Sequence, residues 1–187
     1  MPRKARKAFK TALRAVPGYT MLVFDTNVLL SSLDLLRTVV ESGQWSVIVP
    51  LPVVTELDGL SKNPPPLGLS ATQAISYLES RIRTHSLCLK IQTSRGNYLS
   101  DLLIRTEHVD FTDPLIASRN MDDLILNIAS FQNEHFTDRS KILGQGGAEL
   151  GATKVVLVTF DRNLRLRARA RGIEAVDEKE FKGVLAS

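Results

Sequence analysis

A strand pattern that ends in an acid constrains this chain more than any other feature. Residues 21–24 (Met-Leu-Val-Phe) are apolar and run directly into Asp25, Thr26 and Asn27. A continuous apolar run bounded by capping residues is typical of a strand buried on both faces, as in parallel sheets. Thr26 or Asn27 can cap a helix that begins near Val28. Because ligands of open α/β sheets bind beyond the carboxyl ends of the strands, Asp25 becomes a candidate site residue.

The rest of the chain alternates between strands and helices. Further strands are predicted at residues 47–49, 87–91, 155–159 and 173–176, and helices at residues 28–42, 51–62, 70–84, 122–131, 161–171 and 178–185. A short helix is also expected near residues 98–105. Such alternation is typical of βαβ units. It predicts a three-layer α/β/α fold with a central, mainly parallel sheet of about five strands.

The length and the local composition indicate one domain behind a leader. The chain has 187 residues, which suits one α/β domain. We place this domain at residues 20–187 and a flexible basic leader at residues 1–19, which end in the turn signal Pro17-Gly18. Residues 132–153 are polar and rich in glycine, so we expect a mobile loop there.

The positive charge is concentrated in the leader. Its Lys and Arg residues give +6 before any acid appears, whereas the remainder holds 18 Lys and Arg against 20 Asp and Glu, a balance of −2. A basic tail of this kind contacts phosphates or serves as a nuclear signal. The equally good alternative is a solvated segment at the edge of a domain.

Two classes of protein are disfavoured by the composition. The single cysteine, Cys88, cannot form an intramolecular disulfide, and no Cys/His spacing typical of zinc sites occurs, so a reducing compartment fits best. No apolar run approaches the roughly 18 residues that a membrane helix needs, and no apolar signal segment follows the basic start. We therefore expect a cytoplasmic protein without a membrane partner, and also a nuclear one if the leader acts as a nuclear signal.

Acids recur near the carboxyl ends of the predicted strands. Asp25 and Asp161 each follow a strand, Glu56 lies on the helix after another, and the pair Asp122 and Asp123 opens a helix. In a parallel sheet, such positions converge on one edge. Carboxylates gathered in this way raise one another's pKa unless cations lie between them, and an all-oxygen site suits Mg²⁺ or Mn²⁺ rather than zinc. Because metal-bound water is a nucleophile near neutral pH, the pattern predicts metal-dependent phosphoryl chemistry.

Each acid also has an ordinary structural alternative. Asp25 and Asp161 are both placed to cap a helix, and Glu56 could be a surface acid. Asp122 and Asp123 lie where acids favour a helix N-terminus through its macrodipole. It is the complete set, in this order, that favours a functional site.

Four motifs carry a resemblance to a known family: residues 24–27 (Phe-Asp-Thr-Asn), 54–60 (Val-Thr-Glu-Leu-Asp-Gly-Leu), 122–126 (Asp-Asp-Leu-Ile-Leu) and 158–164 (Val-Thr-Phe-Asp-Arg-Asn-Leu). Over nearly its whole length the chain resembles a PIN domain, the metal-dependent nuclease fold, and most of all the PIN domains of Smg/Est-type proteins of nonsense-mediated mRNA decay and telomere biology. The resemblance implies an endoribonuclease that hydrolyses phosphodiester bonds of single-stranded RNA with Mg²⁺ or Mn²⁺ as cofactor. It also implies mRNA-decay or telomere-associated proteins as further partners.

The resemblance assigns a role to each acid. Asp25, Glu56, Asp122 and Asp161 match the family's acidic quartet, and Asp123 is the alternative to Asp122. We expect Asp25 and Asp122 to bind the metal directly. Glu56 and Asp161 would complete its coordination shell or orient the attacking water.

Polar and basic neighbours extend the candidate site. Asn27 and Thr159 are placed to hydrogen-bond groups around the metal, and capping explains both equally well. Arg162, Arg165 and Arg169 lie at i, i+3 and i+7 on one face of a helix, where they could grip the RNA backbone. A solvated helical face is the alternative.

One departure from the family concerns residue 160. Related sequences often carry two acids before the arginine of the last motif, whereas here the first is Phe160 and only Asp161 remains. Since other members keep only the acid directly before the arginine, we favour an active enzyme. The alternative is a catalytically weak scaffold that binds RNA or mRNA-decay and telomere factors. A phosphotransfer domain with a phosphorylated Asp is disfavoured by Glu56 and by the lack of a placeable lysine.

Overall fold

The centre of the fold is a twisted sheet with helices on both faces. The computed structural model of the chain describes residues 13–105, 120–138 and 151–185. Within these ranges the sheet has six strands in the order β4-β3-β2-β1-β5-β6, and every neighbouring pair is parallel except β3 with β4. The strands are β1 (Met21–Phe24), β2 (Ser46–Pro50), β3 (Leu89–Gln92), β4 (Tyr98–Leu99), β5 (Val155–Val158) and β6 (Glu174–Val176). The predicted three-layer α/β/α class with a mainly parallel sheet is confirmed.

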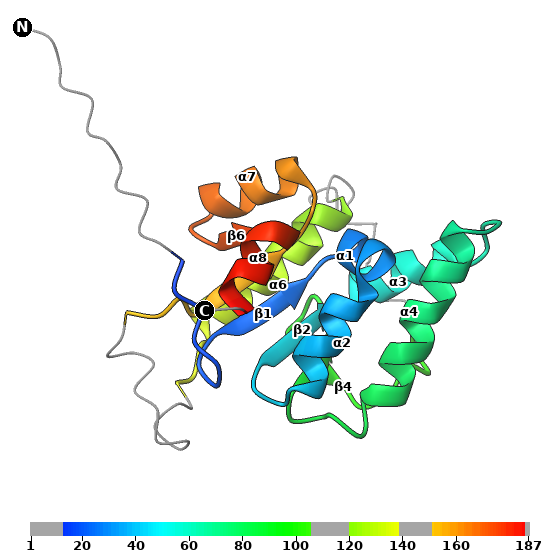
Figure 1. The fold of residues 1–187 in the computed structure, drawn as a ribbon, viewed down its shortest axis with the longest axis horizontal. Coiled ribbons are helices and arrows are strands. Elements are labelled where there is room, and N and C mark those ends of the chain that lie inside the picture. Colours follow the sequence, from blue (N-terminus) through cyan, green and yellow to red (C-terminus); the bar gives the residue numbers. More distant parts are fainter. Residues whose placement is uncertain (1–12, 106–119, 139–150, 186–187) are drawn as a thin grey trace, which may run out of the picture.

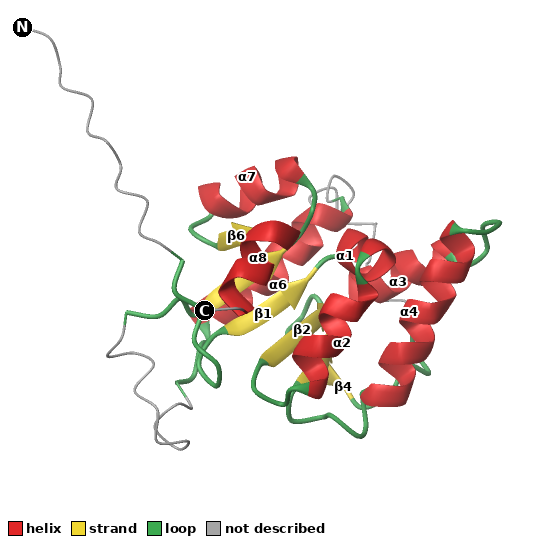
Figure 2. Ribbon diagram, viewed as in Figure 1, coloured by secondary structure: helices red, strands yellow, loops and turns green. Residues whose placement is uncertain are grey.

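The helices form the two outer layers. They are α1 (Thr26–Ser31), α2 (Leu33–Glu41), α3 (Leu51–Leu60), α4 (Leu67–Arg81), α6 (Met121–Glu134), α7 (Arg162–Ala170) and α8 (Glu178–Leu185). In Figure 1, α2 and α8 lie in front of the strands and α6 lies behind them. Figure 2 shows the strands as an inner layer between these helices. Phe24 of β1 makes an edge-to-face ring contact with Phe181 of α8, which fastens α8 to the centre of the sheet.

The central position of β1 determines where the polar residues that follow the strands lie. Its neighbours β2 and β5 are as apolar as β1 itself, because all three strands are covered on both faces. In the register of β1 with β5, Phe24 pairs with Val158. The next residues, Asp25 and Thr159, therefore leave the sheet side by side at its carboxyl edge.

Two predicted helices differ in the structure. The helix predicted at residues 28–42 is divided at Ser32 into α1 and α2. The short helix expected near residues 98–105 is wrong, because Tyr98–Leu99 is strand β4. A tight turn causes this reversal: the Thr93 N–H donates to the Asn97 carbonyl at 2.9 Å, and Gly96 adopts a φ of +88° that favours glycine. The turn folds the chain back against β3 and adds a sixth, antiparallel strand.

The end of the predicted leader is bonded to the segments that precede β5 and β2. The Thr153 N–H donates to the Arg14 carbonyl at 2.8 Å, and the Gly18 N–H donates to the Gln44 carbonyl at 2.8 Å. Residues 1–12, and residues 139–150 of the expected mobile loop, lie outside the described residues, and the loop's first three residues complete α6. In the ranges that are described, no helix has the length and apolar character to cross a membrane.

Two helical glycines predict opposite effects of the same substitution. A Cβ on Gly59 of α3 would have no atom within 4 Å, whereas a Cβ on Gly68 of α4 would lie 1.9 Å from the Asn63 carbonyl oxygen. Gly59→Ala should raise the free energy of unfolding by about 0.5–1 kcal/mol, because alanine loses less backbone entropy in a helix. Gly68→Ala should lower it by roughly 1–3 kcal/mol through the backbone clash. Urea unfolding of both variants tests this pair, and a shift of the same sign in both would contradict it.

Candidate functional site

Asp25 is a buried carboxylate that protein donors hold in one orientation. Its side chain is 5% exposed. Oδ1 accepts from the Thr26 N–H at 2.7 Å, and Oδ2 accepts from the Asn27 Nδ2 at 2.7 Å and from the Thr159 hydroxyl at 2.6 Å. Asp25 is itself the N-cap of α1, so the prediction that Thr26 or Asn27 caps this helix is wrong. Charge-assisted bonds of this kind are stronger than neutral ones, and they fix the carboxylate at the end of β1.

Asn27 and Thr159 join the ends of β1 and β5. The Asn27 Oδ1 accepts from the Phe160 N–H at 3.0 Å, and the Thr159 hydroxyl accepts from the Asp161 N–H at 3.1 Å. Each of these two side chains therefore binds Asp25 and also the backbone that follows β5. The residues that sequence analysis placed as polar neighbours of the site both lie against its central acid.

Glu56 is attached to the same strand end through Thr26. It lies half-buried on α3, and the Thr26 hydroxyl donates to its Oε2 at 2.5 Å. Thr26 thus donates its backbone N–H to Asp25 and its hydroxyl to Glu56. Sequence analysis treated Thr26 only as a cap and missed this link. Nothing in the sequence marks it, because the two residues are 30 positions apart.

Asp122 and Asp123 lie in the first turn of α6 and are bound by arginines of α7. The Arg167 Nη1 donates to the Asp122 Oδ2 at 2.9 Å, and the Arg167 Nη2 donates to the Asp123 Oδ1. The same Asp123 oxygen also accepts from the Arg171 Nη2 at 2.8 Å. Both acids are therefore neutralised from a neighbouring helix, and sequence analysis did not identify either arginine.

Asp161 is exposed and caps α7. Its Oδ1 accepts from the Asn163 N–H at 2.6 Å and from the Leu164 N–H at 3.1 Å. This is the capping alternative considered for this acid, and it directs one carboxylate oxygen to the helix backbone. The chain nonetheless lies close to Asp25 here, because Thr159 bonds both residues.

The charges of Glu56 and Asp122 act on Asp25. The pKa of the Asp25 carboxyl is raised to about 6, chiefly by burial. The hydrogen bonds from Thr159 and Thr26 lower this pKa, and the nearby negative charges of Glu56 and Asp122 raise it. Glu56 and Asp122 therefore each lie near enough to Asp25 for their charge to act on it.

These carboxylates fit a hard divalent cation in type and in charge. Their donors are oxygens, which Mg²⁺ and Mn²⁺ prefer, and the repulsion on Asp25 is of the kind that a bound cation relieves. Across the described part of the chain, no group of three or more His, Cys, Asp or Glu side chains is already arranged to hold an ion. Each carboxylate instead faces a protein donor: a backbone amide, a hydroxyl or a guanidinium.

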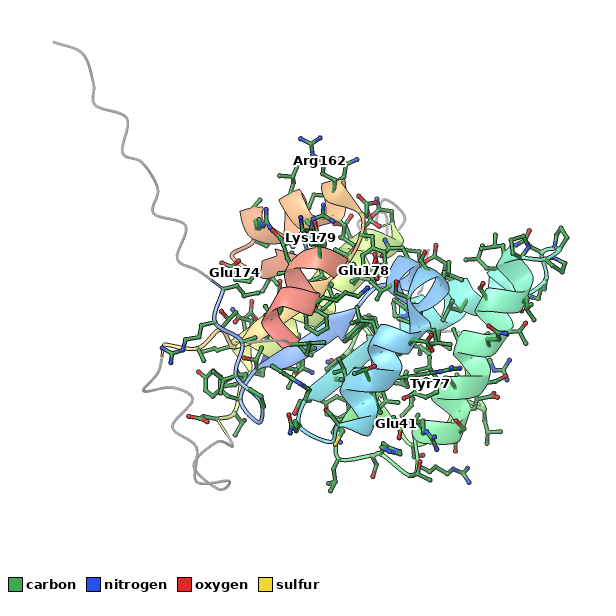
Figure 3. The ribbon with its side chains drawn as sticks, in the orientation of Figure 1. Glu41, Tyr77, Arg162, Glu174, Glu178 and Lys179 are labelled. Atoms are coloured by element: carbon green, nitrogen blue, oxygen red, sulfur yellow. The ribbon has the colours of Figure 1, made fainter. Side chains whose placement is uncertain are left out.

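The predicted arginine face of α7 divides into two kinds of residue. Arg165 donates to the Thr159 carbonyl at 2.8 Å, and Arg169 donates to the Ala175 carbonyl at 2.7 Å. Arg162 is exposed and, among the residues that the structure describes, has no hydrogen-bond or ion-pair partner. Figure 3 shows its side chain pointing outward from α7. Arg162 is thus the one member of this predicted face whose guanidinium the described structure leaves for solvent or a ligand.

One solved structure shares this fold at a TM-score above 0.5, and a second aligns less well. A domain of a functionally unknown protein from Methanocaldococcus jannaschii has a TM-score of 0.51 at 18% identity, over 84% of this chain and 90% of that domain. The PIN domain of human SMG5 has a TM-score of 0.43 at 18% identity, over 86% of this chain and 95% of that one.

Sequence relatives agree with the resemblance. The telomerase-binding protein EST1A of Danio rerio is 31% identical over an alignment of 172 residues that covers 86% of this chain and 11% of that protein. The chain thus corresponds to a small part of that relative. The family model described as "PIN domain" matches residues 22–179. Because this match runs from β1 into α8 and includes the whole acidic edge, the chain belongs to the PIN domain family.

Proposed function

We propose that this PIN domain is a Mg²⁺- or Mn²⁺-dependent endoribonuclease that cleaves single-stranded RNA. The observation that carries the proposal is the buried Asp25 carboxylate, whose pKa is raised to about 6 in part by the charges of Glu56 and Asp122. Carboxyl groups with strongly raised pKa values are concentrated at functional sites of proteins. PIN domains are often nucleases, which supports the same reading.

Asp25, Glu56 and Asp122 are the residues that would hold the metal. A bound Mg²⁺ or Mn²⁺ would supply an activated water and would offset the charge that develops on the phosphate. Neighbouring side chains of the protein orient the carboxylates that would bind the metal. Asn27 and Thr159 fix the Asp25 carboxylate, and the Thr26 hydroxyl does the same for Glu56.

Asp161 and Asp123 have more peripheral roles in this proposal. Asp161 caps α7 through Oδ1, so it would act on the metal or the attacking water from the outside of the site. Asp123 binds two arginines, so we assign metal binding to Asp122 instead.

The biological setting follows from the motifs and the relative. The name of EST1A describes telomerase binding, and the four motifs resemble Smg/Est-type PIN domains. We infer that the chain acts in mRNA decay, in the cytoplasm and also in the nucleus, with mRNA-decay or telomere-associated proteins as partners.

One observation favours a second candidate, a catalytically weak scaffold that binds RNA or decay factors. Arg167 and Arg171 already neutralise Asp122 and Asp123, and Asp161 serves its own helix. A scaffold would bind RNA without cleaving it, which separates the two candidates in one assay.

Cleavage of labelled single-stranded RNA with Mn²⁺ tests the proposed site. Asp25→Asn and Asp122→Asn should each lower the cleavage rate at least about a hundredfold, since even the partners of metal ligands are worth ten- to a hundredfold. Asp34→Asn is the matched control, because the Asp34 side chain is 92% exposed and lies on α2. Equal cleavage by wild type and Asp25→Asn, with all proteins folded, would rule out the nuclease assignment of this edge.

The raised pKa of Asp25 predicts a stability that falls with pH in the metal-free protein. The carboxyl has its ordinary pKa of 3.8 when unfolded and about 6 when folded, so the folded state binds the proton more tightly. Stability from this group is therefore lost as the pH rises from about 4 to about 6, by about 3 kcal/mol. Asp25→Asn should match wild type near pH 4 and exceed it near pH 7 in urea unfolding. A difference that is the same at both pH values would contradict the shift.

Exposed Arg162 should contribute to RNA affinity. Arg162→Gln is expected to raise the Kd for single-stranded RNA about three- to tenfold and to reduce the salt dependence of binding by about one phosphate contact. Lys154→Gln removes the same charge from an exposed residue before β5, at the end of that strand opposite to α7, and should change the Kd less than twofold, by about the effect of a remote screened charge. Filter binding in two salt concentrations measures both, and equal effects of the two variants would show that only net charge matters.

A further inference from the structure

Arg167 links two consecutive acids rather than gripping one. Its two terminal nitrogens donate to different carboxylates, to Asp122 at 2.9 Å and to Asp123. A guanidinium normally binds one carboxylate through both nitrogens, which is the stronger arrangement. Arg167 is 36% exposed, and Asp122 is equally exposed, so neither group is locked inside the core.

The charge that Arg167 neutralises belongs to the candidate metal site. Asp122 is one of the two acids whose charge acts on Asp25. Arg167 is therefore the nearest cationic partner of a carboxylate that a divalent ion would also need. A guanidinium and a metal ion compete for the same carboxylate charge and repel each other.

Asp123 is a second ion-pair partner for Arg167. It already accepts from Arg167 and from Arg171, and Arg171 is tied in turn to the Asn127 Oδ1 at 2.9 Å. An Arg167 that releases Asp122 therefore still has an ion-pair partner. The helix that carries it remains fixed, because Leu164 and Ala168 of α7 are buried in the core.

We propose that Arg167 is an internal counter-cation that occupies Asp122 in the metal-free protein and withdraws onto Asp123 when Mg²⁺ or Mn²⁺ binds. The inference rests on the proposed metal site and adds a residue that sets its affinity. Arg167 is a positioning residue here, because it acts on the metal through Asp122. Asp123 is then the acid that receives the displaced arginine.

Titration of the full chain with Mn²⁺ alone tests this, by calorimetry and by melting temperature. Arg167→Gln should tighten Mn²⁺ binding about tenfold, as expected for a coupling between two ligands of one group, and should lower the melting temperature without metal. Arg171→Gln is the matched control: it removes the same charge from the same region but contacts Asp123 and not Asp122. It should change the Mn²⁺ affinity about threefold at most.

The outcomes separate this inference from the proposed function. Unchanged or weaker Mn²⁺ binding by Arg167→Gln, or equal tightening by Arg171→Gln, overturns the role of Arg167 and leaves the metal site standing. Absence of Mn²⁺ binding by wild type and by Arg167→Gln overturns both. If Arg167→Gln does not fold, Arg167→Lys replaces it: the lysine cannot span both acids and should tighten binding about two- to threefold.

Discussion

The hydrogen bond from the Thr159 hydroxyl to the Asp25 carboxylate is the interaction on which this structure most depends. It is 2.6 Å long, is buried, and joins residues that are 134 positions apart. Burying a carboxylate is costly unless it is hydrogen-bonded, so the end of β5 must be present for Asp25 to be tolerated at the end of β1. The register of β1 with β5 therefore also determines the geometry of the site. A slip of one residue between these strands would turn Thr159 to the opposite face.

The arginines of α7 show how one helix divides its charge among several tasks. Arg165 and Arg169 satisfy backbone carbonyls, Arg167 and Arg171 neutralise the acids of α6, and Arg162 points outward. A helix this basic would repel itself if it were isolated. Here the acids of the first turn of α6 and the carbonyls of Thr159 and Ala175 absorb most of that charge, so the number of arginines says little about how much positive surface remains.

The sequence was sufficient to predict the strands and Asp25 at their carboxyl edge. It was insufficient to predict the contacts between side chains of different elements. Apolar runs, and an alternating pattern at residues 87–91, predicted the five parallel strands, and the acid after the first strand predicted Asp25 at the carboxyl edge. The antiparallel strand β4 was missed, because a strand of two residues has no period to detect. The Thr26–Glu56 and Arg167–Asp122 contacts were missed for a different reason. Each joins side chains on separate elements, and spacing within one helix selected Arg162, Arg165 and Arg169 instead.

Asp161 shows a further limit of sequence reasoning. An aspartate between a strand and a helix satisfies both the capping rule and the pattern of a metal ligand. The structure shows its Oδ1 bound to two backbone amides of α7, and this contact depends on a side-chain rotation that no sequence pattern encodes. The cap uses Oδ1 alone, so the observed cap is compatible with either function.

The two outer strands bear on how the domain avoids aggregation. Strand β4 contributes only Tyr98 and Leu99, too short an edge to template a strand from another molecule. At the opposite edge, Val176 directs its carbonyl to Thr159, so in a parallel strand the carbonyl of Ala175 faces away from the sheet. Arg169 binds that outward carbonyl. One arginine thereby closes the middle of an open edge and places a charge beside it, so that a strand of another molecule cannot readily pair there.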